Sequence, residues 1–120
     1  MRALVIDDEE DVRYVAQMSL GRVGGMTVLV AASGEEGLAT ARRERPDFIL
    51  LDLMMPGMDG PATLRALRQW PETERIPVVF LTAKTLAFGV DSLKELGAKA
   101  VIFKPFDPMT LAADIRTVLQ

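Results

Sequence analysis

Two patterns of hydrophobic residues take turns along the chain. Short runs made almost wholly of apolar residues are typical of strands that are covered on both faces. They alternate with longer segments in which apolar residues recur every three or four positions, as on one face of a helix. The predicted strands span residues 2–6, 26–31, 47–51, 76–82 and 100–103. Five strand–helix units therefore follow one another, with no linker, repeat or low-complexity tract between them.

Capping residues and helix breakers mark the first two helices. The first predicted helix begins at Asp8 and is stopped by the glycine pair at 24–25. Its inward stripe is Val12, Val15, Ala16, Ser19, Leu20 and Val23. Ser33 and Glu36 have the spacing of a capping box, which opens a second helix that runs to about Glu44.

Three further helices follow the third, fourth and fifth strands. Asp59 is the expected cap of a helix over 59–70. The next helix is predicted over 85–97 and contains Gly89, which weakens it. Asp107 with the following proline opens the last helix. The apolar faces of the last two helices are Leu86, Val90 and Leu93, and Leu111, Ile115 and Val118.

This alternation predicts an α/β fold in a single domain over residues 1–120. The strands form one five-stranded parallel sheet, doubly wound, with right-handed crossovers and helices on both faces. In such sheets the functional site lies beyond the carboxyl ends of the strands, near the point where the strand order reverses. The residues at the strand ends are therefore the first place to look for chemistry.

The composition removes several classes of reaction. The chain contains no cysteine and no histidine. Disulfides, thiolate zinc sites, histidine acid–base catalysis and Ser/His/Asp triads are therefore excluded within it. Any reaction must use carboxylates, hydroxyls, lysine or a metal ion held by oxygen.

Charge and hydropathy limit the partners and the location. The net charge is −3, so no basic field favours direct contact with nucleic acid or with an anionic membrane. No apolar run reaches the length of a membrane span, and the N-terminus turns acidic too early for a signal peptide. We expect an intracellular, cytoplasmic protein.

Complementary chemistry follows four of the five predicted strands. The first strand ends in Asp7 and Asp8, the third in Asp52, the fourth in Thr82 and the fifth in Lys104. The second strand ends in alanines, which carry no chemistry. If the sheet is parallel, three carboxylates, a hydroxyl and an ammonium converge on one rim.

Three neighbouring carboxylates need a cation. Two carboxylates about 5 Å apart repel each other by roughly 3 kcal/mol at an effective dielectric constant near 20. Lys104 supplies one positive charge, and Mg²⁺ is a hard cation that commonly binds carboxylates together with phosphate oxygens. A carboxylate beside Mg²⁺ can attack a phosphoryl group, which suggests Asp52 as a nucleophile. Lys104 would then neutralise charge on the transferring oxygens, and Thr82 would donate to the phosphoryl product.

Each of these residues also has an ordinary structural explanation. The acidic run 7–11 is compatible with a solvated helix start, where acidic residues favour the helix dipole. Thr82 on its own is a common β-former, and Lys104 on its own is an exposed lysine. The Met-Pro-Gly segment after Asp52 on its own is a turn whose methionines fill gaps in the core. Their joint occurrence at one rim favours a site over four separate coincidences.

The same residues resemble the receiver domains of two-component response regulators over essentially the whole chain. The matching motifs are Asp7-Asp8, the segment DLMMPGMDG over 52–60, Thr82-Ala83 and Lys104-Pro105-Phe106. The resemblance implies a flavodoxin-like (βα)5 fold with strand order 2-1-3-4-5. It also implies a protein that catalyses its own phosphorylation and dephosphorylation but is not a conventional enzyme.

The resemblance assigns a role to each position. Asp52 is similar to the phosphoacceptor aspartate, Asp8 to a direct Mg²⁺ ligand, and Asp7 to the residue that holds metal-bound water. The backbone carbonyl of Met54 would complete the ligation of Mg²⁺ together with Asp52. Thr82 would be the switch hydroxyl, and Lys104 would pair with the phosphoryl oxygens. The Lys104–Pro105 bond is similar to one that is usually cis.

Two features depart from the family pattern. Many receivers carry an aromatic switch residue three positions before the strand-5 lysine, where this chain has Val101, with Phe103 two residues further on. The coupling between Thr82 and an aromatic ring is therefore expected to be altered. Met54 and Lys84 occupy positions that line the site entrance in the family. We expect them to screen the attacking water and to slow self-hydrolysis of the phosphoryl group.

The expected partners follow from the resemblance. The phosphoryl donor would be a histidine on a sensor histidine kinase or a histidine phosphotransfer protein. The fourth helix, the fifth strand and the fifth helix would form the face that binds an output protein or a second copy as a homodimer. Both a stand-alone receiver and a receiver within a larger protein fit the sequence.

Three other functions fit the sequence less well than a receiver domain. A metal-dependent phosphatase with an aspartyl nucleophile usually has a second acid two residues on, where this chain has Met54. A flavin-binding module needs a phosphate-cradling loop after the first strand, where this chain is acidic. A receiver-like fold that is never phosphorylated is disfavoured by the complete set of strand-end residues, although Val101 supports it weakly.

Overall fold

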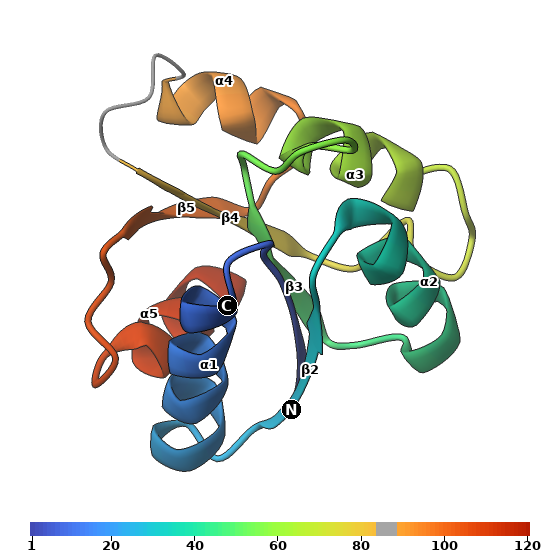
Figure 1. Cartoon of the computed structure of the whole chain (residues 1–120). Coiled ribbons are helices and arrows are strands. Elements are labelled where there is room, and N and C mark those ends of the chain that lie inside the picture. The colour runs from blue at the N-terminus through green and yellow to red at the C-terminus, as the bar shows by residue number, and fades with distance from the viewer. Residues whose placement is uncertain (84–88) are drawn as a thin grey trace.

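The strand prediction is confirmed in the computed structural model, which describes residues 1–83 and 89–120. Five parallel strands form one sheet with the order β2-β1-β3-β4-β5 (Figure 1). The strands are β1 (Arg2–Ile6), β2 (Thr27–Ala31), β3 (Phe48–Asp52), β4 (Val78–Ala83) and β5 (Ala100–Lys104). The order reverses beside β1, so β1 and β3 flank the point where a ligand site is expected.

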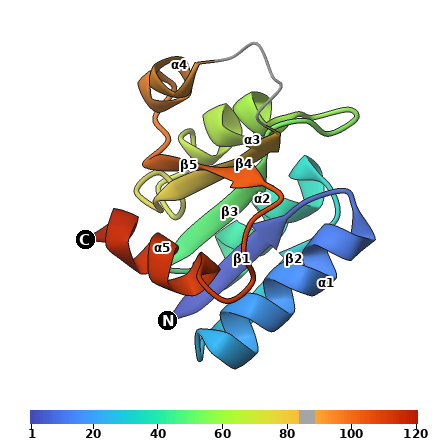
Figure 2. The ribbon, with the colours of Figure 1, turned by 90° about the vertical axis from the view of Figure 1, so that its left-hand side faces the viewer.

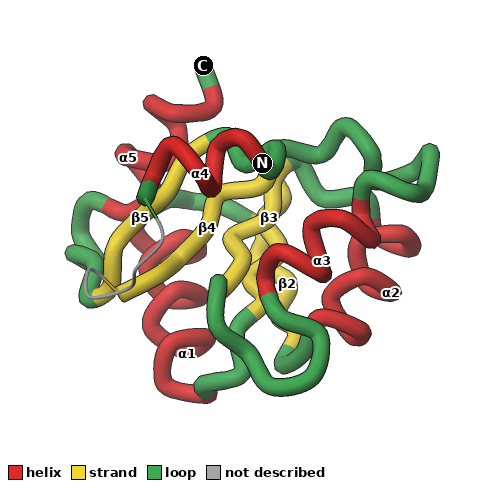
Figure 3. Tube along the Cα trace, turned by 90° about the horizontal axis from the view of Figure 1, so that it is seen from above, coloured by secondary structure: helices red, strands yellow, loops and turns green. Residues whose placement is uncertain are grey.

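Helices cover both faces of the sheet, as a doubly wound fold requires. The helices are α1 (Glu10–Met18), the π-helical turn η1 (Ser19–Val23), α2 (Gly34–Glu44), α3 (Gly60–Leu67), α4 (Val90–Glu95) and α5 (Leu111–Leu119). Helices α1 and α5 lie on one face, and α2, α3 and α4 lie on the other (Figures 1 and 2). Seen from above, the strands run between these two layers of helices (Figure 3). None of the helices in the described part of the chain is long and apolar enough to span a membrane.

The core has two layers because alternate residues of each strand point to opposite faces. In β1, Leu4 and Ile6 pack under α2 and α3, whereas Ala3 and Val5 pack under α1 and α5. Strand β3 is buried along its whole length. Its last residue, Asp52, is therefore held in the interior by the same packing that holds its apolar neighbours.

The first helix departs from the prediction at its end. The backbone N–H of Gly24 bonds to the carbonyl of Ser19, which closes a wider π turn. This turn shifts the phase of the stripe, so Val23 is 47% exposed rather than inward. Val15 was also predicted inward, but it lies at the edge of the stripe and is 37% exposed.

Other helix boundaries also differ. Asp107 forms a turn in which its carboxylate accepts from Met109 N–H, and α5 begins only at Leu111. Gly89 takes the N-cap position of α4 and does not lie in the helix interior, and the predicted Leu86 lies outside the described residues. Helix α3 ends at Leu67, short of its predicted end.

Two of the three predicted N-terminal caps with polar side chains are confirmed, those of Ser33 and Asp59. Ser33 Oγ accepts from Glu36 N–H at 3.1 Å, and the Glu36 carboxylate reaches back to the N–H of Ala32. Asp59 Oδ1 accepts from Ala62 N–H at 2.9 Å. These caps fix where α2 and α3 begin, and both beginnings lie beside the carboxyl ends of the strands.

Candidate functional site

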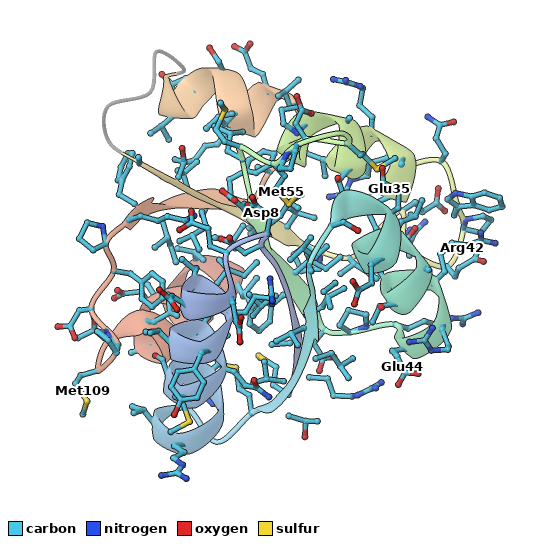
Figure 4. The ribbon with its side chains drawn as sticks, in the orientation of Figure 1. Asp8, Glu35, Arg42, Glu44, Met55 and Met109 are labelled. Carbon is cyan, nitrogen blue, oxygen red and sulfur yellow. The ribbon has the colours of Figure 1, made fainter. Side chains whose placement is uncertain are left out.

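The carboxyl ends of the strands bring the predicted residues together. Asp7 directly follows β1, Asp52 ends β3, Thr82 lies near the end of β4 and Lys104 ends β5. Carboxylate oxygens of Asp7, Asp8 and Asp52 all lie within 4.8 Å of one another. Asp8 lies at the upper end of the sheet (Figure 4).

Most of this cluster is buried. Asp7 is 0% exposed, Asp52 3% and Thr82 4%, whereas Asp8 is exposed. The sheet ladder explains the burial of Asp7, because its N–H continues the pairing of β1 with β2 by donating to the carbonyl of Ala31. The site therefore combines the buried carboxylates of Asp7 and Asp52 with the exposed carboxylate of Asp8.

The loop after Asp52 is held against the site by close packing. The N–H of Gly60 donates to the carbonyl of Leu53 at 3.0 Å. A Cβ atom on Gly60 would lie only 2.6 Å from the carbonyl oxygen of Asp52, so a larger residue would push the loop away. Gly57 has a φ of 71°, a conformation that glycine adopts without strain. These contacts explain why Gly57 and Gly60 occur in the loop that follows the buried Asp52.

Lys104 is shared among three carboxylates. Its Nζ lies 3.0 Å from Asp7 Oδ2, 3.4 Å from Asp52 Oδ1 and 3.6 Å from Glu9 Oε1. Lys104 and Asp52 also meet hydrogen-bond geometry, whereas Asp7 Oδ2 makes an ion pair without it. Glu9 was not predicted as a site residue, because it was counted only as one acid in a charged run.

The surroundings of the site raise the pKa values of both Asp52 and Lys104. Burial, and next the charge of Asp7, raise the pKa of Asp52 to about 7, although the charge of Lys104 acts in the opposite direction. For Lys104, burial acts to lower the pKa, but the close contact with Asp7 and the charges of Asp52 and Glu9 raise it overall. Without a bound metal ion, ionisation of the Asp52 carboxyl is therefore unfavourable, whereas the positive charge of Lys104 is stabilised.

Three buried polar atoms of this cluster lack a hydrogen-bond partner among the described residues. They are Asp7 Oδ2, which makes only the ion pair with Lys104, Asp52 Oδ2 and Thr82 Oγ1. A buried polar group without a partner costs free energy, so a ligand with positive charge or hydrogen-bonding capacity would be stabilised there. The donor set is made of oxygen atoms, which fits Mg²⁺.

The positions predicted to act as a switch lie on neighbouring strands. Thr82 is paired in register with Phe103, whereas Val101 is paired with Phe80 and packs against the core under α2, α3 and α4. Met54 is 59% exposed beside Asp52, and its N–H donates to Asp52 Oδ1 at 3.3 Å. Lys84 lies outside the described residues. The Lys104–Pro105 bond is cis, as the resemblance implied.

A mostly apolar groove opens beside the site. It has a volume of about 400 Å³ and lies between α1 and the segment after β5. Its lining residues are Asp11, Val12, Val15, Lys104, Pro105 and Phe106. The exposed Val15 described above therefore lines this groove, next to the charged cluster.

Comparison with known proteins gives the same family. A family model described as "Response regulator receiver domain" matches residues 3–116. The chain is similar to the transcriptional regulatory protein AfsQ1 of Streptomyces coelicolor, with 40% identity over 98% of this chain and 50% of that protein. It is similar to the alkaline phosphatase synthesis transcriptional regulatory protein PhoP of Bacillus subtilis, with 39% identity over 99% of this chain and 48% of that protein.

Solved structures show the same fold over nearly the whole chain. The chemotaxis protein CheY4 of Vibrio cholerae superposes with a TM-score of 0.89 and 32% identity, covering 98% of this chain and 97% of that one. A putative response regulator from Chloroflexus aurantiacus gives a TM-score of 0.88 and 33% identity, covering 98% and 96%. The chain spans about half the length of the curated relatives that it matches. It belongs to the receiver domains of two-component response regulators.

Proposed function

We propose that this receiver is switched by phosphorylation of Asp52. The observation that carries this proposal is the environment of Asp52, which is buried and has an unpartnered oxygen within the described residues. Asp7 and Asp8 lie beside it, and Lys104 contacts it at 3.4 Å. A buried aspartate that served only the fold would have its oxygens paired.

Each residue of the site would have its own role in phosphoryl transfer. Mg²⁺ would be held by Asp7, Asp8, Asp52 and the backbone carbonyl of Met54, and when bound it neutralises charge on the phosphoryl group. Asp52 attacks phosphorus through its carboxylate. The Lys104 ammonium pairs with the Asp52 carboxylate before the transfer and would pair with the phosphoryl oxygens during and after it. Thr82 Oγ1 then has an acceptor for its hydrogen bond, which pulls the end of β4 toward the site.

The donor would be a phosphohistidine outside this domain, since residues 1–120 contain no histidine. We infer a sensor histidine kinase or a histidine phosphotransfer protein. The apolar groove next to Lys104 would give such a protein a contact surface beside the nucleophile. A small donor in solution gains nothing from this surface.

The output would pass through the face formed by α4, β5 and α5. Thr82 is paired with Phe103 on β5, so a shift at Thr82 reaches this face directly. An output protein or a second copy of the chain would read the shift. The relatives AfsQ1 and PhoP are named as transcriptional regulatory proteins. With a net charge of −3, the receiver itself would act through protein contacts and not by touching nucleic acid.

The test is an intact-mass measurement after incubation with Mg²⁺ and acetyl phosphate. The unaltered protein should gain one phosphoryl group, and Asp52→Asn should gain none. Asp59→Asn is a matched control, because it removes one carboxylate from the same loop and asparagine caps a helix as well as aspartate. It should be phosphorylated normally.

Two outcomes would overturn the assignment. Equal phosphorylation of Asp52→Asn would place the acceptor elsewhere. If the unaltered protein gains no mass and beryllium fluoride also fails to shift its NMR spectrum, the domain is a constitutive binding module. Val101 would then be the first position to replace with tyrosine.

The lifetime of the phosphoryl group is a separate proposal. Met54 is exposed at the mouth of the site, where its side chain would screen the attacking water, and Lys84 would add to this screen. Met54→Asn and Lys84→Ala should each speed the loss of phosphate, by roughly two- to tenfold, a barrier change of about 1 kcal/mol. The measurement is the decay of phosphorylated protein after donor removal. Rapid decay that neither substitution alters would rule out the screen.

A further inference from the structure

Glu9 holds an unusual position at the start of α1. It is the N-cap residue of that helix, but its side chain makes no capping hydrogen bond. Glutamate is not among the residues that favour this position, since serine, threonine, aspartate and asparagine cap best. Its side chain instead reaches Lys104 Nζ, 3.6 Å away, and stays 63% exposed. Helix capping therefore does not explain why glutamate occupies position 9. Its contact with Lys104 requires a different explanation.

The backbone fixes Glu9 beside the site. Its N–H donates to Asp7 Oδ1 at 2.9 Å, so it is tied to one of the buried carboxylates. Its carbonyl accepts from Arg13 N–H at 3.1 Å, and the Arg13 side chain donates to the carbonyl of Asp7 at 2.8 Å. The loop between β1 and α1 thus presents the Glu9 carboxylate at the rim, on the side of Lys104.

We propose that Glu9 restrains phosphorylation of Asp52 by small anionic phosphoryl donors. This rests on the proposed function of Asp52. Glu9 acts in two ways through the same contact. It adds a negative charge on the approach to the site, and its ion pair with Lys104 Nζ competes with the phosphoryl oxygens for that ammonium. Glu9 is a positioning residue, since it acts on the reacting atoms through Lys104.

The charge balance explains why small donors are affected. The Lys104 ammonium pairs with three carboxylates, those of Asp7, Asp52 and Glu9, and the carboxylate of Asp8 lies close to those of Asp7 and Asp52. Acetyl phosphate brings two further negative charges and has too few atoms to gain from the apolar groove. A donor protein that contacts the groove has binding energy to set against the same repulsion. Glu9 thus favours protein donors over metabolites that carry an activated phosphoryl group.

The transfer itself needs no further reactant. An oxygen of Asp52 forms a bond to phosphorus as the bond from phosphorus to the acetyl oxygen breaks. The electron pair of the broken bond leaves with acetate, and no proton is transferred. Lys104 has three N–H donors, and it must turn at least one toward the phosphoryl oxygens. Glu9 is the most exposed of its three carboxylate partners, so it is the partner that competes with the donor from the solvent side.

The experiment compares Glu9→Gln with Glu10→Gln at saturating Mg²⁺. Glu10 is the exposed neighbour, so its substitution removes the same charge without touching Lys104. Glu9→Gln should raise the second-order rate constant for acetyl phosphate by about three- to tenfold at low salt. The gain should be smaller for phosphoramidate, which carries less negative charge, and should shrink as salt is added. Glu10→Gln should change the rate constant by less than about twofold.

A second readout does not depend on catalysis. Glu9→Gln should lower the concentration of beryllium fluoride that half-saturates the amide shifts in NMR spectra, because this anion occupies the phosphoryl position without transfer. A purely structural role for Glu9 would change neither the charge dependence nor the salt dependence. Equal acceleration by both variants would reduce the effect to overall charge, and no acceleration by Glu9→Gln would overturn the proposal. Failure of the unaltered protein to accept phosphate at all would instead reject the role of Asp52.

Discussion

Each end of the central sheet carries a cluster of charged residues, and the two clusters are built differently. At the amino ends of the strands, the N–H of Arg2 donates to Asp47 Oδ2 at 2.6 Å. The Arg2 guanidinium pairs with Glu44 Oε1 at 2.8 Å and also donates to the carbonyl of Glu44. Arg43 bonds to the other carboxylate oxygen of Glu44 at 3.1 Å. Glu44 lies at the lower end of α2, far from Asp8 at the upper end of the sheet (Figure 4).

In the cluster at the amino ends of the strands, the lower cluster, the Glu44 carboxylate has all its hydrogen-bond partners. In the cluster at the carboxyl ends, the upper cluster, buried oxygens lack them within the described part of the chain. Both oxygens of Glu44 have donors, and its hydrogen bonds with Arg43 and then Arg2 lower its pKa. At the upper end, one ammonium serves three carboxylates, and burial raises the pKa of Asp52. A cluster that is complete by itself can only support the fold. A cluster left short of positive charge and hydrogen bonds is prepared for a ligand.

The largest expected effect comes from removing the ammonium of the upper cluster. Lys104→Met should slow phosphorylation of Asp52 by roughly 10²-fold, because no side chain then neutralises the transferring oxygens. Intact-mass time courses with acetyl phosphate and saturating Mg²⁺ measure this rate. Lys99→Met removes a lysine from the segment before β5 and should leave the rate unchanged. A Lys104→Met rate within twofold of the unaltered protein would show that the ion pair belongs to the fold alone.

The second prediction concerns the pH dependence of stability without metal. The pKa of Asp52 rises from 3.8 to about 7 on folding, so the folded protein binds its proton more tightly than the unfolded chain. Its contribution to the free energy of unfolding therefore falls as pH rises from about 4 to 7, by about 2–4 kcal/mol, and stays low above that range. In Asp52→Asn this loss is absent. Urea unfolding in EDTA at pH 4 and pH 8 measures the difference.

The control for this prediction separates the site from overall charge. Asp59→Asn removes one exposed carboxylate and should follow the pH profile of the unaltered protein. Mg²⁺ added at pH 8 should restore stability to the unaltered protein, since binding to the folded state alone is stabilising. Parallel profiles for Asp52→Asn and the unaltered protein would contradict a raised pKa.

The upper cluster could be predicted from the sequence because topology alone brings it together. A parallel sheet places all strand ends at one edge, so finding Asp7, Asp52, Thr82 and Lys104 at strand ends was sufficient. No knowledge of side-chain conformation was needed. The fold followed in the same way, since its strands are short apolar runs with clear boundaries.

The features that the sequence did not predict depend on local backbone and side-chain geometry. Such geometry leaves no signal in the hydrophobic periodicity of the sequence. The contact of Glu9 with Lys104 depends on where the side chain of an N-cap residue points. The exposure of Val23 results from a π turn whose extra residue leaves no mark in the hydrophobic pattern. The late start of α5 arises because the Asp107 carboxylate caps a separate turn. A signal for Glu9 was available, since glutamate is a poor N-cap.

The third prediction concerns the hydroxyl of Thr82, a neutral group of the upper cluster. Thr82 Oγ1 is buried with no partner among the described residues, so the hydroxyl costs stability before phosphorylation. Thr82→Val keeps the shape and should leave the unphosphorylated protein equally stable or more stable by about 1 kcal/mol. It should also weaken the NMR shifts that beryllium fluoride causes in β5. A loss of stability above about 1 kcal/mol would show that Thr82 is already hydrogen-bonded, for example to water.

The smallest effect is expected at the lower cluster. Glu44→Gln removes a charge that pairs with Arg2 and Arg43, and surface pairs of this kind contribute little. The pKa of Glu44 is lowered on folding, so its contribution is present above pH 4.5 and is lost as pH falls through the folded pKa, opposite in sign to Asp52. Urea unfolding at pH 7 should show a loss near the limit of detection, and phosphorylation should be unchanged. A variant that slowed phosphorylation would mean that the two ends of the sheet are coupled, and the division between a structural and a functional cluster would then fail.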